Sequence, residues 1–247
     1  MSRSNYDHRF NSPADRRPMR RPHGQSTGSH RRVLRFEPLE DRRLLSITVD
    51  TLVDEFDGSI HDRDVSLRDA IYAARVGETI TFDSSLDGET ISLAQALGEL
   101  VINKSLEIDA TGLPHGLTID AGNGADHIFA TGDGFRIFYI DDGNLMADKM
   151  VSIAGLTLTG GDVATWGGAI LSREDLAVIG CTISSNSANY GGGIYNSGRR
   201  TLTLTKSTVK KNSALVDGGG IFNEPGGTVT FEDSKVKNNT PNDCVGC

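Results

Sequence analysis

The chain is poor in cysteine, proline and aromatic residues, and it has no long apolar run. Its 247 residues include 3 cysteines, 7 prolines and 6% aromatic side chains, against 29 glycines. So few cysteines exclude a dense disulfide framework, and no apolar segment reaches the length of a transmembrane helix. Abundant glycine with few large side chains favours tight turns and thin layers over a bulky helical core. A chain of this length can still bury one sizeable core or two small ones.

Lysine is absent from the first 46 residues, which hold 11 arginines and 5 acidic residues and so carry a net charge of +6. Because the whole chain carries −8, residues 47–247 carry −14 (−8 minus +6). The arginines are not interleaved with aromatic side chains, which argues against nucleic-acid binding. We expect residues 1–46 to be a disordered basic leader, because this composition cannot bury enough apolar surface to become ordered.

The leader ends with a recognisable phrase, FEPLEDRRLLS, from Phe36 to Ser46. It resembles the N-terminal sorting signature of planctomycete bacteria, in which a Glu-Pro-Leu-Glu-x-Arg-x-Leu-Leu core precedes large exported surface proteins. An ordinary secretory signal peptide is not expected, because the apolar run that it requires is missing. The resemblance implies a secreted or cell-surface protein, and it leaves open the mode of anchoring and whether the leader is cleaved.

One short helix is expected at about residues 66–75, as a cap on the body that follows. Ser66 is a good N-cap, and Asp69 at the third helical position completes a capping box. Apolar residues follow from Leu67 at helical spacing, and Gly77 is expected to end the helix.

After this helix, short β-rich runs alternate with Gly, Asn and Asp turns, and the last four runs repeat. Inward aliphatic positions recur at Leu158, Ile183, Val209 and Val236, at intervals of 25, 26 and 27 residues. A period in the twenties indicates a solenoid, and the density of β-branched residues and glycine excludes a helical one. We predict an all-β fold over residues 47–247, a right-handed parallel β-helix (a pectate-lyase-like solenoid) of about six or seven coils, clearest in 151–247.

Three further columns share this register, and the period of two between the first two of them is that of strands. They are Val151, Leu176, Leu202 and Val229; Ile153, Val178, Leu204 and Phe231; and Leu156, Cys181, Ser207 and Ser234.

Two near-identical phrases, GGGIYN and GGGIFN, are interpreted as corners of the coils. Their glycines allow close approach of the backbone where the chain turns into its next strand. Tyr195 and Phe222 are expected to point outward and stack on one another. No Lys-Ser/Thr and no helix follow them, so a phosphate-binding loop is not indicated. The corner glycines are Gly167, Gly168, Gly191, Gly192, Gly193, Gly218, Gly219 and Gly220.

A polar column completes the repeat, since Asn186, Asn212 and Asn239 each follow the inward aliphatic residue by three positions. We expect their side-chain amides to bond to one another from coil to coil, and the asparagines to adopt the left-handed backbone conformation at the bend. Gly161 takes the same place in the preceding coil.

These repeats carry a family resemblance. Gly-Gly-[Ala/Gly]-Ile followed by aromatic-x-Asn resembles the repeats of the chlamydial polymorphic outer-membrane proteins and related bacterial surface β-helix proteins. The stretch VSLRDA is similar to the Cys-Ser-Leu-Arg-Glu-Ala motif of bacterial surface repeat proteins, with Val65 and Asp69 replacing its Cys and Glu. Both resemblances imply a passive, often adhesive, structural role at the cell surface and bring no catalytic residues.

An enzyme is the alternative, because some β-helix proteins bind or degrade polysaccharides as lyases or hydrolases with clustered carboxylates. Asp162, Asp217 and Glu232 fall in different columns, so no catalytic residue is predicted. His127 and Trp166 are interpreted as turn or surface residues.

A run of acids precedes the expected helix, and it lacks the spacing of a Ca²⁺-binding loop. We interpret it as a solvated loop, with weak Ca²⁺ binding as the alternative and no other cofactor. The run consists of Asp54, Glu55, Asp57, Asp62 and Asp64.

The three cysteines have separate expected roles. Cys181 lies in an inward column and is predicted to be a buried free thiol. Cys244 and Cys247 form a C-x-x-C pair, for which export would favour a disulfide, whereas a metal site would need two more ligands. The tail that holds them is expected to fold over the last coil as a lid, or to leave that end for self-association or another surface component.

Overall fold

The structure is a computed structural model that describes residues 46–61, 64–126, 128–144 and 149–247. The chain divides into two units, residues 1–42 and 43–247, and every described residue belongs to the second. The expected leader up to residue 45, and the interpretations of Asp62 and His127, lie outside the described residues.

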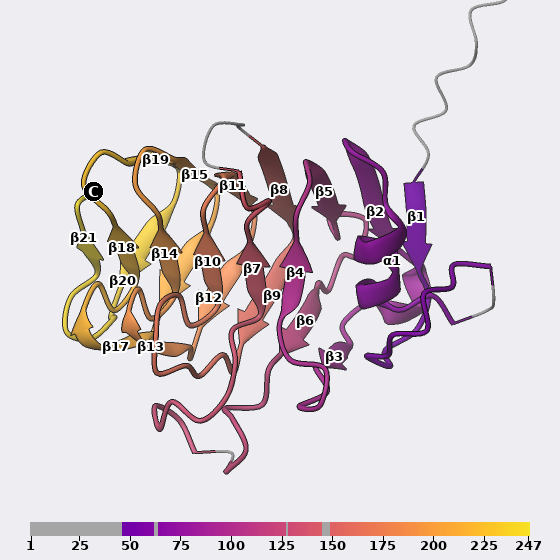
Figure 1. Cartoon of the computed structure of the whole chain (residues 1–247), viewed down its shortest axis with the longest axis horizontal. Helices are drawn as coiled ribbons and strands as arrows, with labels where there is room; N and C mark the ends of the chain where they lie inside the picture. The colour runs from indigo at the N-terminus through magenta and orange to yellow at the C-terminus, as the bar shows by residue number, and fades with distance from the viewer. Residues whose placement is uncertain (1–45, 62–63, 127, 145–148) are drawn as a thin grey trace, which may run out of the picture. The chain divides into compact units, whose positions relative to one another are not determined.

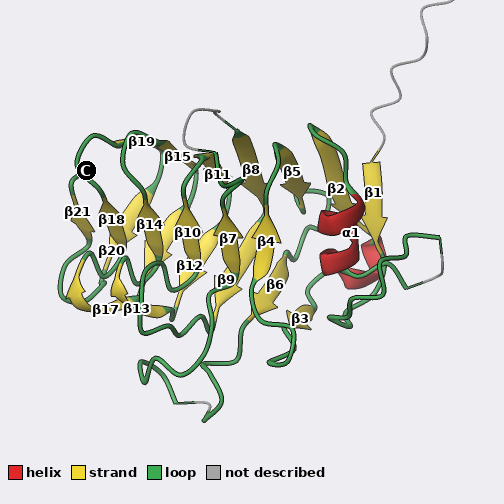
Figure 2. Cartoon of the chain, viewed as in Figure 1, coloured by secondary structure: helices red, strands yellow, loops and turns green. Residues whose placement is uncertain are grey.

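Three parallel sheets make up the body (Figures 1 and 2). The first sheet, in the order β1-β2-β5-β8-β11-β15-β19, consists of β1 (Ser46–Val49), β2 (Glu78–Phe82), β5 (Leu106–Asp109), β8 (Met150–Ala154), β11 (Asp175–Ile179), β15 (Thr201–Thr205) and β19 (Thr228–Glu232). The second sheet, in the order β3-β6-β9-β12-β16-β20, consists of β3 (Thr90–Ser92), β6 (Leu117–Asp120), β9 (Leu156–Thr159), β12 (Thr182–Ser184), β16 (Thr208–Lys210) and β20 (Lys235–Lys237). The third sheet, in the order β4-β7-β10-β14-β18-β21, consists of β4 (Leu100–Ile102), β7 (Phe138–Ile140), β10 (Ile170–Ser172), β14 (Ile194–Asn196), β18 (Ile221–Asn223) and β21 (Cys244–Val245). A separate pair consists of β13 (Ser187–Tyr190) and β17 (Ser213–Asp217), and a short 3-10 helix, η1, spans Ser84–Leu86.

The chain visits the three sheets in a constant order. From β2 to β21 it passes through the first, second and third sheet six times, and we call each pass a coil. Each strand pairs in parallel with its counterpart in the coil before or after it, and all pairs between the named strands are parallel. This is the layout of an all-β solenoid, and it confirms the β-rich, parallel character predicted from the sequence.

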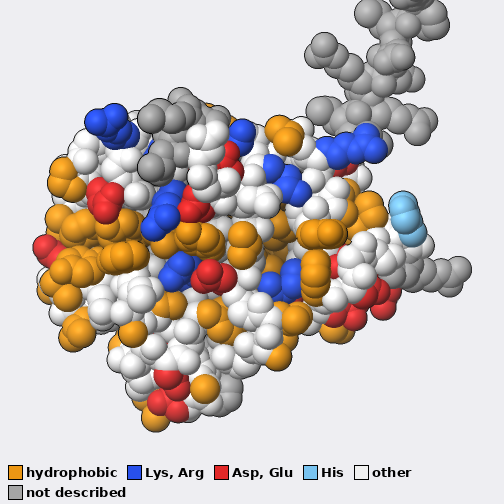
Figure 3. All heavy atoms as spheres, viewed as in Figure 1, with side chains coloured by type: hydrophobic (Ala, Val, Ile, Leu, Met, Phe, Trp, Pro, Cys, Tyr) orange, Lys and Arg blue, Asp and Glu red, His pale blue; other side chains and the backbone are white. Residues whose placement is uncertain are grey.

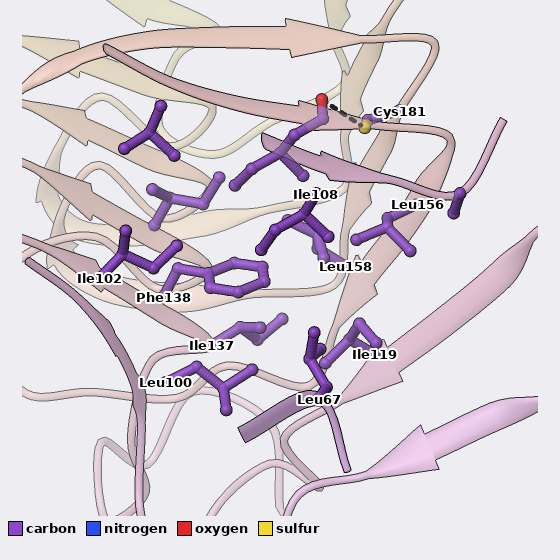
Figure 4. Packing of buried hydrophobic residues seen from close by; sticks show 14 of the residues in the cluster. Leu67, Leu100, Ile102, Ile108, Ile119, Ile137, Phe138, Leu156, Leu158 and Cys181 are labelled. Carbon is purple, nitrogen blue, oxygen red and sulfur yellow. Dashed lines mark hydrogen bonds between the residues drawn. The ribbon is translucent and has the colours of Figure 1, made fainter. Parts of the chain in front are cut away.

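The core lies between the three sheets and is a stack of aliphatic side chains (Figure 4). Ile183 pairs in register with Leu158 on one side and Val209 on the other, and Val209 pairs with Val236. The first three of these residues are fully buried, whereas Val236 in the last coil is half-buried. Like residues thus stack on like residues along the solenoid.

The one α-helix among the described residues, α1, spans Leu67–Ala73 and packs against β1 and β4. The Ser66 hydroxyl accepts a hydrogen bond from the Asp69 N–H at 3.0 Å and donates one to the Asp69 carboxylate at 2.8 Å. The helix ends before residue 75, because Ala74 is already extended with ψ 141°. Lys104, from the loop after β4, donates to the carbonyls of Ile71, Tyr72 and Ala74 at 2.8–3.1 Å and satisfies the last turn.

Glycine is required at the corners for two different reasons. Gly167, Gly191 and Gly218 open the stretches GGAI, GGGIYN and GGGIFN. Their φ angles are 67°, 64° and 66°, a left-handed conformation that glycine adopts without strain. The glycines that follow lie against backbone carbonyls of the next coil. A Cβ atom on Gly192, for example, would overlap the carbonyl oxygens of Ser213 and Gly219.

The asparagines of the polar column form a buried ladder. The Asn186 amide donates to the Asn212 Oδ1 at 3.0 Å, and the Asn212 amide donates to the Asn239 Oδ1 at 3.0 Å. Each Oδ1 also accepts the backbone N–H of the preceding asparagine in the ladder. The ladder continues beyond the repeat, since the Asp243 carboxylate accepts both the side-chain and the backbone N–H of Asn239.

The expectation that these asparagines adopt the left-handed conformation is wrong by one residue. The left-handed positions are Ser185, Lys211 and Asn238, with φ of 57°, 56° and 59°, and Gly160 with 75° in the coil before. The asparagine after each bend keeps ordinary backbone angles, because its role is to bond to the neighbouring coils rather than to turn the chain.

The C-terminal tail does not fold over the end as a lid. It forms β21, which pairs in parallel with β18, and Cys244 and Cys247 are joined by a disulfide. The aliphatic column is less covered in this last coil, where Phe231 is 41% exposed although its partner in the previous coil, Leu204, is fully buried. The tail therefore continues the third sheet.

Gly192→Ala tests the close approach at the corners. We expect the variant to lose about 2–4 kcal/mol of unfolding free energy, because the added methyl must displace two backbone carbonyls that hold neighbouring coils together. Urea unfolding followed by circular dichroism gives the change. Gly112→Ala is the matched control, since nothing lies within 4 Å of a Cβ placed there. Equal stability of the two variants would contradict the explanation.

Candidate functional site

Three carboxylates converge where β7 and β10 end. Asp141 and Asp142 directly follow β7, Glu174 follows β10, and one oxygen of each lies within 4.8 Å of the others. Parallel pairing of β7 with β10 brings the two connections together, although they are more than 30 residues apart in sequence. Sequence reasoning missed this group, because the chain before residue 151 has no clear repeat from which the register could be inferred.

Each carboxylate of this acidic cluster has a cationic neighbour. Arg173 lies 3.1 Å from Asp141, Lys149 lies 3.5 Å from Asp142, and Arg200 lies 3.7 Å from Glu174. The cluster is thus close to neutral, and a bound divalent cation would have to compete with three protein cations.

Glu174 holds a connection of the chain in place. Its side chain is 2% exposed and accepts the backbone N–H groups of Asp142 at 3.4 Å and Lys149 at 3.2 Å. These two residues lie on the connection between β7 and β8. The buried carboxylate therefore satisfies donors that would otherwise be left without partners.

Two neighbouring acids of the cluster have opposite pKa shifts. Burial raises the pKa of Glu174, and a hydrogen bond shared with Asp142 raises it further, against the opposing effects of the backbone donors and Arg200. The pKa of Asp142 is lowered, chiefly by the hydrogen bond from the Asn144 N–H. Of the two carboxyls, Glu174 is therefore the one that takes up a proton first as the pH falls.

Asp141 also contacts side chains on the outer face of the third sheet. It accepts the Tyr139 hydroxyl at 2.6 Å and the Gly143 N–H at 2.8 Å, and Arg173 adds a charged contact. Burial alone would raise the pKa of Asp141, but these partners outweigh burial and lower it. The carboxylate is an acceptor fixed by its neighbours.

The acids singled out from the sequence do not join this cluster. Asp162 is fully buried and accepts the N–H groups of Thr131 and Gly132 together with the Ser187 hydroxyl. The Asp217 carboxylate accepts the Asn242 amide, and the Glu232 carboxylate accepts a threonine hydroxyl. They lie in separate places, as their different columns indicated.

The interpretation of the acidic run as a solvated loop is wrong for Asp54. Its side chain is 2% exposed and forms a two-point ion pair with Arg68, both contacts at 2.8 Å. It also accepts the Ala94 N–H at 2.8 Å. The partner lies 14 residues away, on α1, which explains why composition alone could not reveal this role.

Cys181 is a buried free thiol whose Sγ donates to the Ile153 carbonyl at 3.4 Å (Figure 4). Burial raises its pKa to about 11, so the thiol stays protonated. Trp166 is 44% exposed and packs against Tyr195 with ring centroids 5.9 Å apart, in a surface packing role.

No protein-family profile, curated protein or solved structure matches the chain. Among the described residues, no helix is long and apolar enough to cross a membrane.

The variant Glu174→Gln tests whether the pKa of Glu174 is raised in the folded protein. The raised pKa means that the folded protein binds more protons than the unfolded chain, so the stability contributed by this carboxyl falls as the pH rises from about 4.5 through the folded pKa. Glutamine cannot ionise, and its one carbonyl oxygen keeps an acceptor for one of the two backbone donors. We therefore expect the unfolding free energy of the wild type to fall relative to that of Glu174→Gln over this interval.

Urea unfolding at a series of pH values measures the difference. Glu89→Gln, the same change at an exposed position, is the control and should follow the wild type. If Glu174→Gln also runs parallel to the wild type, the pKa of Glu174 is not raised in the folded protein.

Proposed function

We propose that residues 46–247 form a right-handed parallel β-helix of six coils and that the protein is an exported structural, adhesin-like component of the cell surface. The observation that carries the proposal is the use of the conspicuous sequence motifs for coil-to-coil contacts. Corner glycines, asparagines and buried acids all bond to neighbouring coils. A repeating scaffold of this kind presents long side faces, which suits a passive binding role.

The right-handed sense of the β-helix is supported by a general rule. Connections between parallel strands of one sheet are right-handed in nearly all proteins, because strand twist favours that sense. Here every return to a sheet is such a connection.

Export is supported by the phrase at residues 36–46 and by its resemblance to a planctomycete sorting signature. The first strand, β1, begins at Ser46, the last residue of the phrase, so that the signature stands directly before the β-rich body in the sequence. A signal read by a cellular export system needs no core of its own and is suited to such a place.

A polysaccharide lyase or hydrolase is the second candidate. The observation in its favour is the convergence of Asp141, Asp142 and Glu174 beside Arg173, since such enzymes use grouped carboxylates with a basic neighbour. The close pairing of these charges with one another favours the structural proposal. We expect no new reducing or unsaturated ends when the protein is incubated with pectic or neutral polysaccharides, whereas turnover that Asp141→Asn abolishes would favour the enzyme.

Removal of residues 1–46 tests the structural proposal. We expect the thermal midpoint of the body to be nearly unchanged, because Ser46 at the exposed start of β1 is the only described strand residue that is removed, and extracellular delivery to be lost. Cell fractionation and antibody labelling of intact bacteria measure delivery. Alanine at Glu37, Pro38 and Leu39 is the finer variant, with alanine at Arg20 and Arg21 as its control. Normal delivery without the leader would refute the assigned role.

A further inference from the structure

Charge is unevenly divided along the solenoid. Residues 47–149 hold 20 acidic and 6 basic residues, a net charge of −14, whereas residues 150–247 hold 8 of each and are neutral. On the face that Figure 3 shows, the largest groups of acidic side chains lie near α1 and on the loop between β6 and β7. The last four coils, which begin at β8, are therefore much less acidic than the first two.

Four of the seven lysines of the chain lie together on the outward side of the second sheet, in its last two coils. Lys210 is on β16, Lys235 and Lys237 are on β20, and Lys211 forms the bend after β16 with φ of 56°. Lys210 and Lys237 are direct partners in the parallel pairing, so their Cα atoms are roughly 4.8 Å apart. We call these four residues the lysine patch.

The charges of the lysine patch are not neutralised by nearby acids. Among the described residues, no ion pair joins any of the four to a carboxylate. The nearest acid in the outward column of Lys210 is Asp120, three coils earlier and roughly 14 Å away. That distance exceeds the screening length of about 10 Å at moderate salt. Glu232 and Asp233 stand before β20, at the corner where the Lys206 N–H donates to the Glu232 carbonyl.

Protection of a sheet edge explains only part of the lysine patch. Lysines on an edge strand prevent pairing with other chains, and β20 is the last strand of the second sheet. Lys210 lies on β16, which is paired on both sides, with β12 and with β20. Like charges on neighbouring strands destabilise a sheet, so the contact of Lys210 with Lys237 opposes folding. An anionic partner would offset this repulsion.

Two exposed apolar side chains adjoin the lysine patch. Leu215 and Val216, on β17, follow Lys211 by four and five residues and are 81% and 50% exposed. The Ala214 N–H donates to the Thr240 carbonyl at 2.7 Å, which places β17 beside the chain that follows β20. Figure 1 shows β17 and β20 close together at the C-terminal end. One corner of the last two coils therefore presents four cations and two apolar side chains.

This combination favours a membrane surface over a nucleic acid. Anionic headgroups attract lysines, and the boundary beneath them accommodates apolar side chains. A nucleic acid would leave Leu215 and Val216 in water. It would also find no ring on which to stack a base, because residues 208–216 and 235–240 contain no aromatic side chain.

A folded protein partner is less suited to this corner. Specific protein interfaces bury roughly 800 Å² on each side, whereas the lysine patch covers two neighbouring strands and a bend. A planar membrane needs no matching shape and no pocket. The net charge of −14 on residues 47–149 is repelled by an anionic surface, which leaves the last coils as the part that makes contact.

We propose that the lysine patch, with Leu215 and Val216, docks the protein on a membrane surface that carries anionic phosphate headgroups. The first coils then point away from that surface. The proposal deepens the proposed function, on which it rests, because it supplies the attachment of an exported protein. Binding to vesicles is measured with purified protein and does not require export, so the two proposals can fail separately.

The full-length protein is sedimented with vesicles that contain phosphatidylglycerol and phosphatidylcholine in equal amounts, and with vesicles of phosphatidylcholine alone. We expect saturable binding to the first that weakens as salt is raised, and none to the second. The double variant Lys210→Gln, Lys237→Gln should bind about tenfold or more weakly.

Matched variants separate the lysine patch from net charge and from the basic leader. Arg20→Gln with Arg21→Gln removes the same charge outside the patch and should bind like the wild type. Lys210→Arg with Lys237→Arg keeps both charges and should also bind like the wild type. Thermal unfolding establishes that each variant is folded.

Leu215→Ser tests the apolar contact without a change of charge. It should weaken vesicle binding about threefold or more, because less apolar surface enters the membrane boundary. Val53→Ser, at a side chain that is 58% exposed on the loop before α1, is the control and should have no effect.

Four results would overturn the proposal. The first is no binding to the anionic vesicles, and the second is an equal loss of binding in the Arg20, Arg21 variant. A third is binding that Leu215→Ser leaves unchanged, together with binding of a single-stranded oligonucleotide that the Lys210, Lys237 variant abolishes. The fourth is a dimer in sedimentation without vesicles that the same lysine variant abolishes, which would assign the patch to a second copy of the chain.

Discussion

Parallel hydrogen bonding between successive coils is the constraint on which the rest of this structure depends. A strand shifted by one residue against its neighbour would turn every side chain to the opposite face, so the register must hold through all six coils. The number of residues in a coil can therefore vary only in the connections between its strands. The pairing of Leu117 with Leu156 is in register although the chain between them passes through β7, β8 and two long connections.

The same constraint explains how much of the fold could be predicted from the sequence. In the last coils the connections have nearly constant length, so Ile183, Val209 and Val236 appear as a column in the sequence and pair as one in space. Earlier, the paired residues Ile108 and Ile153 are 45 positions apart (108 to 153), and no period is visible. The acidic cluster arises in that irregular part, where register alone brings Glu174 to Asp142.

Several buried carboxylates have the same structural role, which cannot be inferred from their positions in the sequence. Asp54, Asp162 and Glu174 each accept backbone N–H groups from a connection between strands. A loop fixed by a carboxylate needs fewer apolar contacts to stay ordered, which is consistent with a body that has few large side chains and many acids. Because these oxygens are engaged, a high content of acids does not by itself indicate a catalytic site.

The asparagine ladder also has a direction. Every side-chain amide in it donates towards the following coil, from Asn186 to Asn212 to Asn239, so the amide dipoles are aligned and polarise one another. Their positive ends point towards the last coil, much as the N–H groups do at the start of a helix. The group that accepts from the final amide is the carboxylate of Asp243, a full negative charge at the positive end of the row. The ladder is therefore an electrostatically polar axis through the solenoid, and its terminus has a charge of the stabilising sign.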